Sequence, residues 1–219
     1  MKLHLLGYSE SSLSRLMDVL WMQGSHKEVV IVQNKESEEK YPFAHPGLSY
    51  RKVFWQDWQF DAQKHICLPA VTGVESKYAV YQFFKTAFGI DEKHYTQLIH
   101  PGSIISETAA LGMGCFAEPG SIITSFAQLG FGVSINRGVT VGHHTIIGDF
   151  VSLSPGVHIA GHCTIGDRTQ IGIGTVVFNG VKIGTRCIIG GGSVVTKDIP
   201  DGMIAWGNPC KAVKPITQT

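Results

Sequence analysis

The chain has 219 residues, enough for one large domain or for two small domains with cores of their own. Eighteen basic residues against 17 acidic residues give a net charge of +1, which argues against an extended nucleic-acid-binding surface. No apolar run reaches the roughly 18 residues that a membrane span needs, and the stretch from Met1 to Gly7 is too short for a secretion signal. Five cysteines in such a chain indicate reduced thiols and a cytoplasmic protein.

Charged residues and glycines divide the chain into two parts. Residues 1–97 hold 22 of the 35 charged residues but only 5 of the 26 glycines. Residues 98–219 hold the other 13 charged residues and 21 glycines, and these glycines alternate with Ile and Val. We therefore predict a small domain over 1–97, a repetitive domain over 98–199 and a C-terminal segment over 200–219.

The first part has the alternating pattern of an α/β domain. Buried strands are predicted at Lys2–Leu6, Val29–Val32 and His65–Val71. Helices are predicted after Gly7 and from about Glu75 to Phe88, because apolar residues recur there at helical spacing. Strands that alternate with helices predict a small Rossmann-like parallel sheet, with ligand at the carboxyl ends of the strands.

The turn after the first strand lacks the GxGxxG pattern of a dinucleotide-binding loop. It carries Ser9, Ser11 and Ser12 at the start of the first helix. Backbone N–H groups at a helix N-terminus can hold a phosphate, and serines there can equally be ordinary helix caps. Both interpretations are open at this point.

The second part repeats every six residues. Sixteen of the 17 positions in this series are Ile, Leu or Val, and Ala117 is the exception. The series consists of Ile99, Ile105, Leu111, Ala117, Ile123, Leu129, Ile135, Val141, Ile147, Leu153, Ile159, Ile165, Ile171, Val177, Ile183, Ile189 and Val195. The residue two places earlier is small or β-branched in every case but Gln97, and glycine follows directly eight times.

A six-residue period equals three strand periods and fits no helix, so it predicts a parallel β-helix. The pattern resembles the left-handed β-helix of the hexapeptide-repeat acyltransferases, in which three hexapeptides make one triangular coil. This resemblance implies that residues 18 apart stack at about 4.8 Å. Cys115, Cys163 and Cys187 then point inward as packed, inert thiols.

Two adjacent histidines, His143 and His144, lie outside the inward positions of their repeat. By the stacking rule, His143 faces the bare backbone of Gly161 on the next coil, and His144 stacks on His162. Histidine suits a general base at neutral pH. A backbone N–H at Gly161 would suit stabilisation of an oxyanion.

The whole chain resembles the bacterial sugar acetyltransferases that include sialic acid O-acetyltransferases and UDP-4-amino-sugar N-acetyltransferases. Asn136, His143 and the run Ile147-Gly148-Asp149-Phe150 match the N-acetyltransferase branch. Three further segments match the family, namely Leu98-Ile99-His100-Pro101, Gly190-Gly191-Gly192-Ser193 and Trp206-Gly207-Asn208-Pro209-Cys210-Lys211.

The resemblance implies a homotrimer that transfers acetyl from acetyl-CoA to the amino group of a nucleotide-linked 4-amino-4,6-dideoxy sugar for surface glycan (O-antigen) synthesis. UDP is the favoured nucleotide, with dTDP and GDP left open. His143 is implied as general base, with Asn136 and His144 in the catalytic site. The implied acetyl-CoA contacts are Ser152, Gly161, Ile173 and Gly191. The implied nucleotide-sugar contacts are Ser9, Glu10, Ser11, Gln33, Asn34, Thr72 and Gly73. No metal is expected, and transfer is expected to be direct because the CoA thiolate leaves readily.

The sequence departs from the family pattern at three places. His144 stands where the family has an acidic partner for the catalytic histidine, and Ser152 replaces its second active-site histidine. Gln33 and Asn34 replace the paired acids that grip the ribose.

Three other functions remain open from the sequence. The first is O-acetylation of sialic acid or another sugar. The second is a zinc hydratase of the gamma carbonic anhydrase type, with ligands among His143, His144, His158 and His162. The third is a non-catalytic protein that binds a nucleotide sugar or acts as a scaffold. The remaining histidines are expected to be surface or capping groups, namely His4, His26, His45, His65, His94 and His100.

Overall fold

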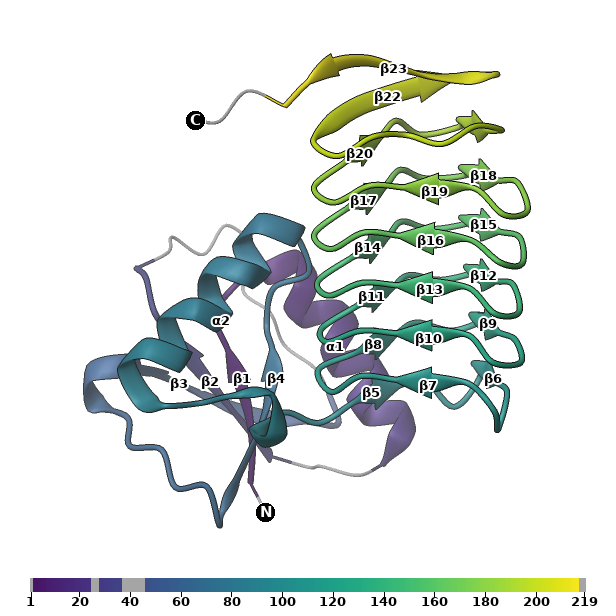
Figure 1. The fold of residues 1–219 in the computed structure, drawn as a ribbon. Coiled ribbons are helices and arrows are strands. Elements are labelled where there is room, and N and C mark those ends of the chain that lie inside the picture. The colour runs from purple at the N-terminus through teal and green to yellow at the C-terminus, as the bar shows by residue number, and fades with distance from the viewer. Residues whose placement is uncertain (1, 25–27, 37–45, 217–219) are drawn as a thin grey trace. The chain divides into compact units, whose positions relative to one another are not determined.

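The computed structural model describes residues 2–24, 28–36 and 46–216. The chain divides into two compact units, Met1–Pro101 and Gly102–Thr219 (Figure 1). Each unit has its own core. Within the described residues, no helix has the length and apolar content required to cross a membrane.

The first unit is built on a four-stranded parallel sheet in the order β3-β2-β1-β4. The strands are β1 (Lys2–Leu6), β2 (Glu28–Gln33), β3 (Ser49–Phe54) and β4 (His65–Pro69). The three strands predicted from the sequence are present, whereas β3 was not predicted. Strand β3 lies at the sheet edge and is only partly buried, so it shows no continuous apolar run.

Two long helices accompany this sheet, α1 (Glu10–Gln23) and α2 (Val74–Phe88). Short 3-10 helices follow at η1 (Trp55–Asp57) and η2 (Glu92–His94). Both long helices end at a glycine in the left-handed conformation, Gly24 with φ 66° and Gly89 with φ 67°. Leu13, Leu16 and Leu20 of α1 are buried, as the helical spacing predicted. Strand β5 (Leu98–Ile99) closes this unit.

The second unit consists of two-residue strands stacked in three parallel ladders (Figure 1). The first ladder contains β7 (Ala110–Leu111), β10 (Gln128–Leu129), β13 (Ile146–Ile147), β16 (Thr164–Ile165) and β19 (Lys182–Ile183). The second contains β8 (Phe116–Ala117), β11 (Ser134–Ile135), β14 (Ser152–Leu153), β17 (Gln170–Ile171) and β20 (Ile188–Ile189). The third contains β6 (Ile104–Ile105), β9 (Ile122–Ile123), β12 (Thr140–Val141), β15 (His158–Ile159), β18 (Val176–Val177) and β21 (Val194–Val195).

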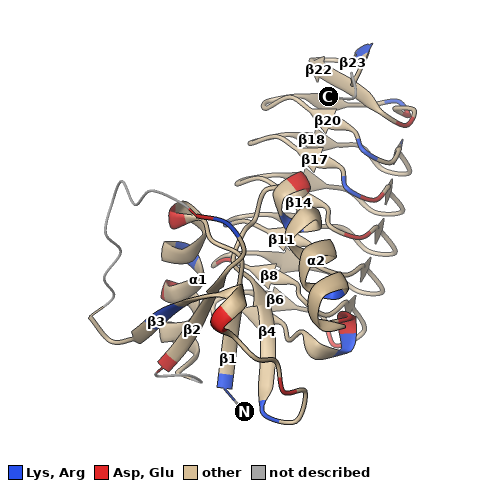
Figure 2. Cartoon of the chain, turned by 90° about the vertical axis from the view of Figure 1, so that its left-hand side faces the viewer, with Lys and Arg blue, Asp and Glu red and all other residues tan. Residues whose placement is uncertain are grey.

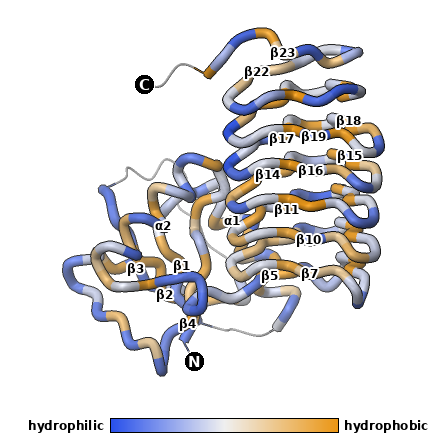
Figure 3. The backbone as a smooth tube through the Cα atoms, viewed as in Figure 1, coloured by the Kyte–Doolittle hydropathy of each residue, from blue (hydrophilic) through white to orange (hydrophobic). Residues whose placement is uncertain are grey.

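Strand register confirms the predicted stacking. Residues 18 apart are paired in the ladders from β6 to β21, for example Ser134 with Ser152 and Val141 with Ile159. The six-residue series and the residues two places before it fill the interior, so Ile171 and Thr175 are fully buried. Apolar stretches therefore recur along the coils and are separated by more hydrophilic turns (Figure 3).

The small inward side chains bond to backbone groups of the next coil. Thr169 Oγ1 donates to Gly184 O at 2.7 Å, and Thr175 Oγ1 donates to Gly190 O at 3.1 Å. The inward cysteines are free thiols in the core, as expected. Burial raises the pKa of Cys163 and of Cys187, which keeps both thiols protonated.

A hairpin follows the last coil. Strand β22 (Met203–Gly207) pairs in parallel with β20 and antiparallel with β23 (Cys210–Pro215). An added Cβ on Gly190 would lie 2.8 Å from Trp206 Cβ, so the absence of a side chain at Gly190 lets the hairpin pack against the coil.

His4 is not the surface or capping group expected from the sequence. It is only 2% exposed, and Trp58 Nε1 donates a hydrogen bond to its Nδ1 at 2.9 Å. The His65 ring lies 4.1 Å from the His4 ring, centre to centre. Burial, followed by the nearby charges of His65, Arg51 and Lys2, lowers the pKa of His4 to about 4. His94 does cap its 3-10 helix, while His26 and His45 lie outside the described residues.

The buried His4 predicts that the first unit loses stability in mild acid. Because the folded state keeps His4 neutral, the unfolded chain binds the extra proton between pH 6.5 and about 4. The free energy of unfolding should therefore be highest above pH 6.5 and should fall by up to about 3 kcal/mol as the pH approaches 4. Urea unfolding followed by tryptophan fluorescence at several pH values measures this loss.

Replacement of His4 by Gln keeps an acceptor for Trp58 and removes the titrating group. His4→Gln should flatten the acid dependence, whereas the exposed His158→Gln should leave it unchanged. An equal acid dependence in the wild type and in His4→Gln would contradict the assignment to His4.

Candidate active site

The turn at residues 142–145, between β12 and β13, carries His143 and His144 and is named the histidine turn. Both side chains are exposed. The imidazole of His143 lies over Gly161 of the next coil, since a Cβ built on Gly161 would be 2.7 Å from His143 Cε1 and 2.8 Å from its Nε2. The predicted contact between His143 and a bare backbone is therefore present.

Gly161 also offers a free hydrogen-bond donor. The residue is buried, and its N–H has no hydrogen-bond acceptor within the part of the chain that the structure describes. Its carbonyl, by contrast, accepts from Gly180 N at 3.0 Å. An unpaired buried N–H next to an exposed imidazole is a suitable donor to a negatively charged oxygen.

Three imidazoles meet at the histidine turn. His143 Nδ1 lies 3.1 Å from His144 Nδ1, so one ring donates a hydrogen bond to the other. His162 stacks on His144 with a ring separation of 5.1 Å and an interplanar angle of 17°, as predicted. Phe126 lies on His144 at 5.0 Å, so Phe126, His144 and His162 form a ladder of rings along consecutive coils.

His158 does not join this cluster. It projects from strand β15, and its Nδ1 shares a hydrogen bond with Thr140 Oγ1 at 2.9 Å. Of the four histidines considered for a zinc site, the structure therefore brings together His143, His144 and His162.

Asn136 lies at a different turn from His143. It follows β11, and strand β12 separates it from the histidine turn. Its side chain is 7% exposed, and its Nδ2 donates to Leu153 O at 2.5 Å. The seven-residue spacing therefore brings the two residues to opposite ends of one short strand, and the amide of Asn136 is engaged by the neighbouring coil.

The residues predicted to contact acetyl-CoA are spread over the coil. Gly161 underlies His143, whereas Ser152 lies in β14, where it pairs with Ser134 and Gln170. Ile173 is 62% exposed at a further turn, and a Cβ on Gly191 would lie 2.9 Å from its Cγ2. The glycine thus leaves a side-chain-free surface beside an exposed apolar residue.

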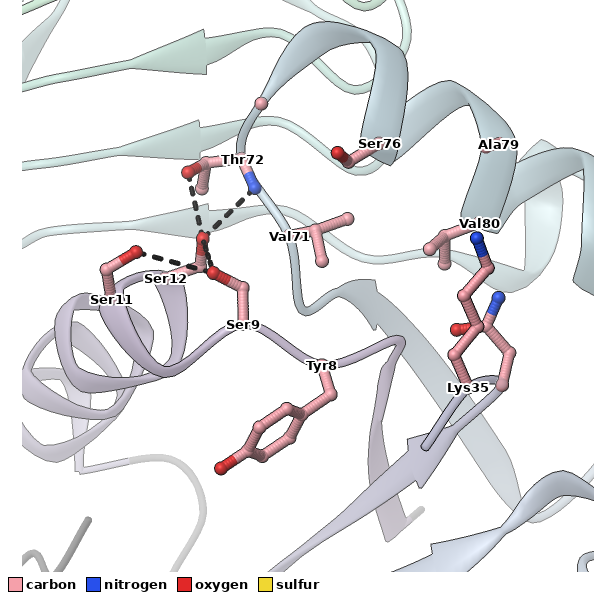
Figure 4. A pocket seen from close by; sticks show the side chains of 12 residues that line it. Tyr8, Ser9, Ser11, Ser12, Lys35, Val71, Thr72, Ser76, Ala79 and Val80 are labelled. Atoms are coloured by element: carbon pink, nitrogen blue, oxygen red, sulfur yellow. Dashed lines mark hydrogen bonds between the residues drawn. The ribbon is translucent and has the colours of Figure 1, made fainter. Parts of the chain in front are cut away.

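A pocket of about 390 Å³ lies in the first unit at the carboxyl ends of its strands (Figure 4). Five of the seven predicted nucleotide-sugar residues line it, namely Ser9, Ser11, Asn34, Thr72 and Gly73. Ser9 and Gly73 are the N-caps of α1 and α2, so the pocket lies at the start of both helices. The Ser9 side chain makes no capping hydrogen bond to the backbone of α1, and Gly73 has no side chain.

The hydroxyl groups of this pocket form a connected network. Ser12 Oγ lies 3.0 Å from Thr72 Oγ1 and donates to Ser9 Oγ at 3.2 Å (Figure 4). Arg15 donates to Thr72 Oγ1 at 2.6 Å. Ser9, Ser11 and Thr72 are therefore brought together, whereas Glu10 and Gln33 are not part of the lining, and Gln33 is buried.

The pocket also has polar residues that were not identified from the sequence, among them Lys35 and Tyr8. Lys35 lines the pocket beside Asn34, and Tyr8 does so beside Ser9. Lys52 Nζ donates to the Tyr8 hydroxyl at 3.3 Å and lies 4.7 Å from the centre of its ring. Burial and the charge of Glu10 raise the pKa of Tyr8, so the phenol remains a neutral donor and acceptor. Neither Lys35 nor Tyr8 belongs to a sequence motif, so the sequence gave no indication that they line a pocket.

The second unit has few charged residues (Figure 2). The histidine cluster itself contains no carboxylate and no permanent cation. Hydrogen bonding and ring stacking therefore orient its imidazoles, rather than ion pairing.

Comparison with known proteins identifies the repeats and the fold. Residues 162–197 match the family model described as bacterial transferase hexapeptide (six repeats). No curated protein matches the sequence. Among solved structures, the acetyltransferase domain of PglB from Neisseria gonorrhoeae FA1090, in complex with acetyl coenzyme A, is 24% identical with a TM-score of 0.83, over 97% of this chain and 98% of that chain.

Two further structures are similar over their whole length. PerB from Caulobacter crescentus, in complex with CoA and GDP-perosamine, is 24% identical with a TM-score of 0.79, over 98% of each chain. WeeI from Acinetobacter baumannii AYE is 22% identical with a TM-score of 0.80, over 97% of this chain and 100% of that chain. The predicted fold, a small Rossmann-like α/β unit followed by a left-handed parallel β-helix, is confirmed.

The contact between His143 and Gly161 predicts the effect of a single methyl group. In Gly161→Ala the new Cβ would meet only the far end of the His143 side chain, so the ring should turn away while the coil remains folded. If His143 is the base, we expect kcat to fall by about 10²-fold, a typical cost of misplacing a catalytic group by an ångström. Acetyl transfer and thermal melting should be measured on the same protein.

Gly142→Ala is the matched comparison, because its Cβ would lie 2.4 Å from the backbone carbon of Ala160 and should destabilise the coil itself. Full activity in a folded Gly161→Ala protein would show that the position of the His143 ring over Gly161 is unimportant.

Proposed function

We propose that this protein is an acyltransferase that moves acetyl from acetyl-CoA to the amino group of a nucleotide-linked 4-amino-4,6-dideoxy sugar. The observation that carries the proposal is the exposed His143 imidazole seated on the buried Gly161, whose N–H has no acceptor among the residues that the structure describes. The fold adds support, because chains of the same fold have been solved with acetyl coenzyme A and with CoA and GDP-perosamine.

His143 is proposed as the general base. A hydrogen bond from its Nδ1–H to His144 Nδ1 leaves Nε2 with the lone pair that accepts the proton. The amine attacks the thioester carbonyl, and the Gly161 N–H stabilises the oxyanion that forms. The CoA thiolate then leaves and takes the proton back from the imidazolium, so no covalent enzyme intermediate is needed.

His144 acts as a positioning residue in this scheme. It holds the tautomer of His143, and it is itself held between Phe126 and His162. An imidazole cannot provide the negative charge that the family's acidic residue provides. Asn136 is retained as a proposed site residue on the resemblance alone, since its amide bonds to Leu153 O in this chain.

The nucleotide is proposed to bind in the pocket of the first unit. Two helix N-termini and Lys35 give it donors and positive charge for a diphosphate, and Asn34 and Thr72 offer neutral hydrogen bonds. UDP is the proposed nucleotide, and GDP is the competitor to test because the PerB complex contains GDP-perosamine. Acetyl-CoA is proposed to extend from Gly161 toward Ile173 and Gly191 in the C-terminal direction of the coils.

The proposed assembly is a homotrimer. Ile104 and Ile122, paired on strands β6 and β9, are 65% and 36% exposed, and Ile146 is 49% exposed. Apolar side chains on the outer faces of the coils suit packing against other subunits. Sedimentation equilibrium should give three times the chain mass of 23.8 kDa, and an active monomer would contradict the proposal.

The cytoplasm is the proposed compartment, in keeping with five free cysteines.

A substrate panel tests the function. CoA release should be measured with UDP-, dTDP- and GDP-linked 4-amino sugars and with sialic acid, each with acetyl-CoA. We expect turnover with an amino-sugar nucleotide and a product acetylated on nitrogen. Turnover with sialic acid alone would assign the protein as an O-acetyltransferase, and no turnover with any acceptor would favour a non-catalytic role.

Substitutions of His143 should separate chemistry from folding. His143→Asn or His143→Ala should lower kcat by about 10²–10⁴, the usual contribution of a positioned base, without lowering the melting temperature. The loss should shrink at high pH, where the sugar amine is already unprotonated. His144→Ala should cost less than His143→Ala. The reverse order, with His144→Ala inactive and His143→Ala active, would refute the assignment.

A further inference from the structure

The three imidazoles at the histidine turn form a potential metal site. One ligand nitrogen from each of His143, His144 and His162 lies within 4.8 Å of the others, and all three side chains are exposed. We propose that these three residues bind one divalent transition-metal ion, with Zn²⁺ as the reference ion, and that the bound ion blocks His143.

The distance between two of the nitrogens already suits a metal. Zinc binds imidazole nitrogen at about 2.0–2.1 Å in tetrahedral sites, so two ligand atoms of one ion lie roughly 3.3–3.4 Å apart. His143 Nδ1 and His144 Nδ1 are 3.1 Å apart. A hydrogen bond now joins these two nitrogens, and an ion bound by both would replace the proton of that bond.

His162 supplies the third ligand from the next coil. Its ring centre lies 4.8 Å from that of His143, with the two planes at 88°. Because the side chain is exposed, it can turn about its Cα–Cβ and Cβ–Cγ bonds without disturbing the core. The ring of His162 now stacks on His144, so binding requires a rotation of side chains and leaves the backbone in place.

The backbone at this point is fixed before any ion arrives. His162 N donates to His143 O at 2.9 Å, which ties the two coils together at the site. His144 and His162 both adopt the left-handed conformation, with φ 56° and 58°, at equivalent turns. Glycine would be the easy choice for such a conformation, as at Gly180, the equivalent position one coil later. Two histidines are present instead.

The donor set selects the kind of ion. Three neutral imidazoles suit zinc, copper and nickel, whereas magnesium and calcium prefer oxygen ligands. Three protein ligands on an exposed surface leave a fourth position open to solvent. His158, which bonds to Thr140 from the face of a ladder, is not part of the set.

Inhibition by the ion rests on the proposed function. When Nδ1 of His143 binds the ion, the ring proton is carried by Nε2. Nε2 then has no lone pair with which to accept the proton of the amine. Such an ion competes with catalysis and is not a cofactor. Binding of the ion itself does not depend on the acetyltransferase activity.

Zinc titration of the full chain tests the binding. Any affinity tag should be removed and thiols should be left out of the buffer, because both bind zinc. Isothermal titration with ZnCl₂ should give one site per chain, and Co²⁺ should give the visible spectrum of a tetrahedral site. Residues that hydrogen-bond to metal ligands typically contribute 10–100-fold to metal affinity. Loss of a direct ligand in His162→Gln should therefore weaken zinc binding by at least about tenfold.

His158→Gln is the matched control, since it removes an exposed histidine from a nearby strand and should bind zinc like the wild type. His144→Gln is a second ligand variant, in case His162→Gln does not fold. No saturable zinc binding by the wild type, or equal binding by wild type, His162→Gln and His144→Gln, would overturn the proposal.

Activity measurements separate this proposal from the proposed function. Each variant should be assayed with and without zinc and compared with its own zinc-free rate, with EDTA to reverse the effect. Zinc should inhibit the wild type and His158→Gln, and it should inhibit His162→Gln less. Zinc binding without acetyl transfer to any acceptor would leave the metal site standing and refute the function. Acetyl transfer unaffected by saturating zinc would refute the block of His143.

Discussion

Stacking of one coil on the next with an offset of 18 residues is the constraint on which the second unit depends. Each short strand has only two residues, too few to be stable alone. Its backbone groups are satisfied by the coils on either side, as in the bonds from Gly142 N to Ile159 O at 2.8 Å and from His162 N to His143 O at 2.9 Å. A change at one turn is therefore felt by the turns stacked on it.

This constraint explains how a rigid repeat can hold the residues of an active site. The interior positions are committed to packing, so the variable residues lie at the turns and on the outer faces. At the histidine turn, the two histidines project where the next coil has Gly161 and His162. The glycine makes room for the His143 ring and leaves an N–H without an acceptor within the described residues, and the stacked ring of His162 supports His144. The site is thus made of residues that lie 18 or 19 apart in the sequence and touch in space.

The sequence predicted these contacts because a strict period turns spacing into position. The stacking of His144 on His162 and the placement of His143 over Gly161 both followed from adding 18. The period could not predict the direction in which an exposed ring turns, so the bond between His143 Nδ1 and His144 Nδ1 came only from the structure. In the first unit, without a repeat, β3 was missed because its half-exposed edge carries Arg51 and Lys52. His4 was misassigned because its strand neighbours Leu3 and Leu5 gave no sign of the Trp58 partner.

The central claim is that His143 removes the proton from an amine that attacks acetyl-CoA above Gly161. A crystal structure of the protein with CoA and an amino-sugar nucleotide tests it most directly. The acceptor nitrogen should lie about 2.6–3.2 Å from His143 Nε2, with the CoA sulfur beside it and Gly161 N facing the position of the acetyl oxygen. Both ligands bound at another turn, with His143 out of reach of the amine, would contradict the claim.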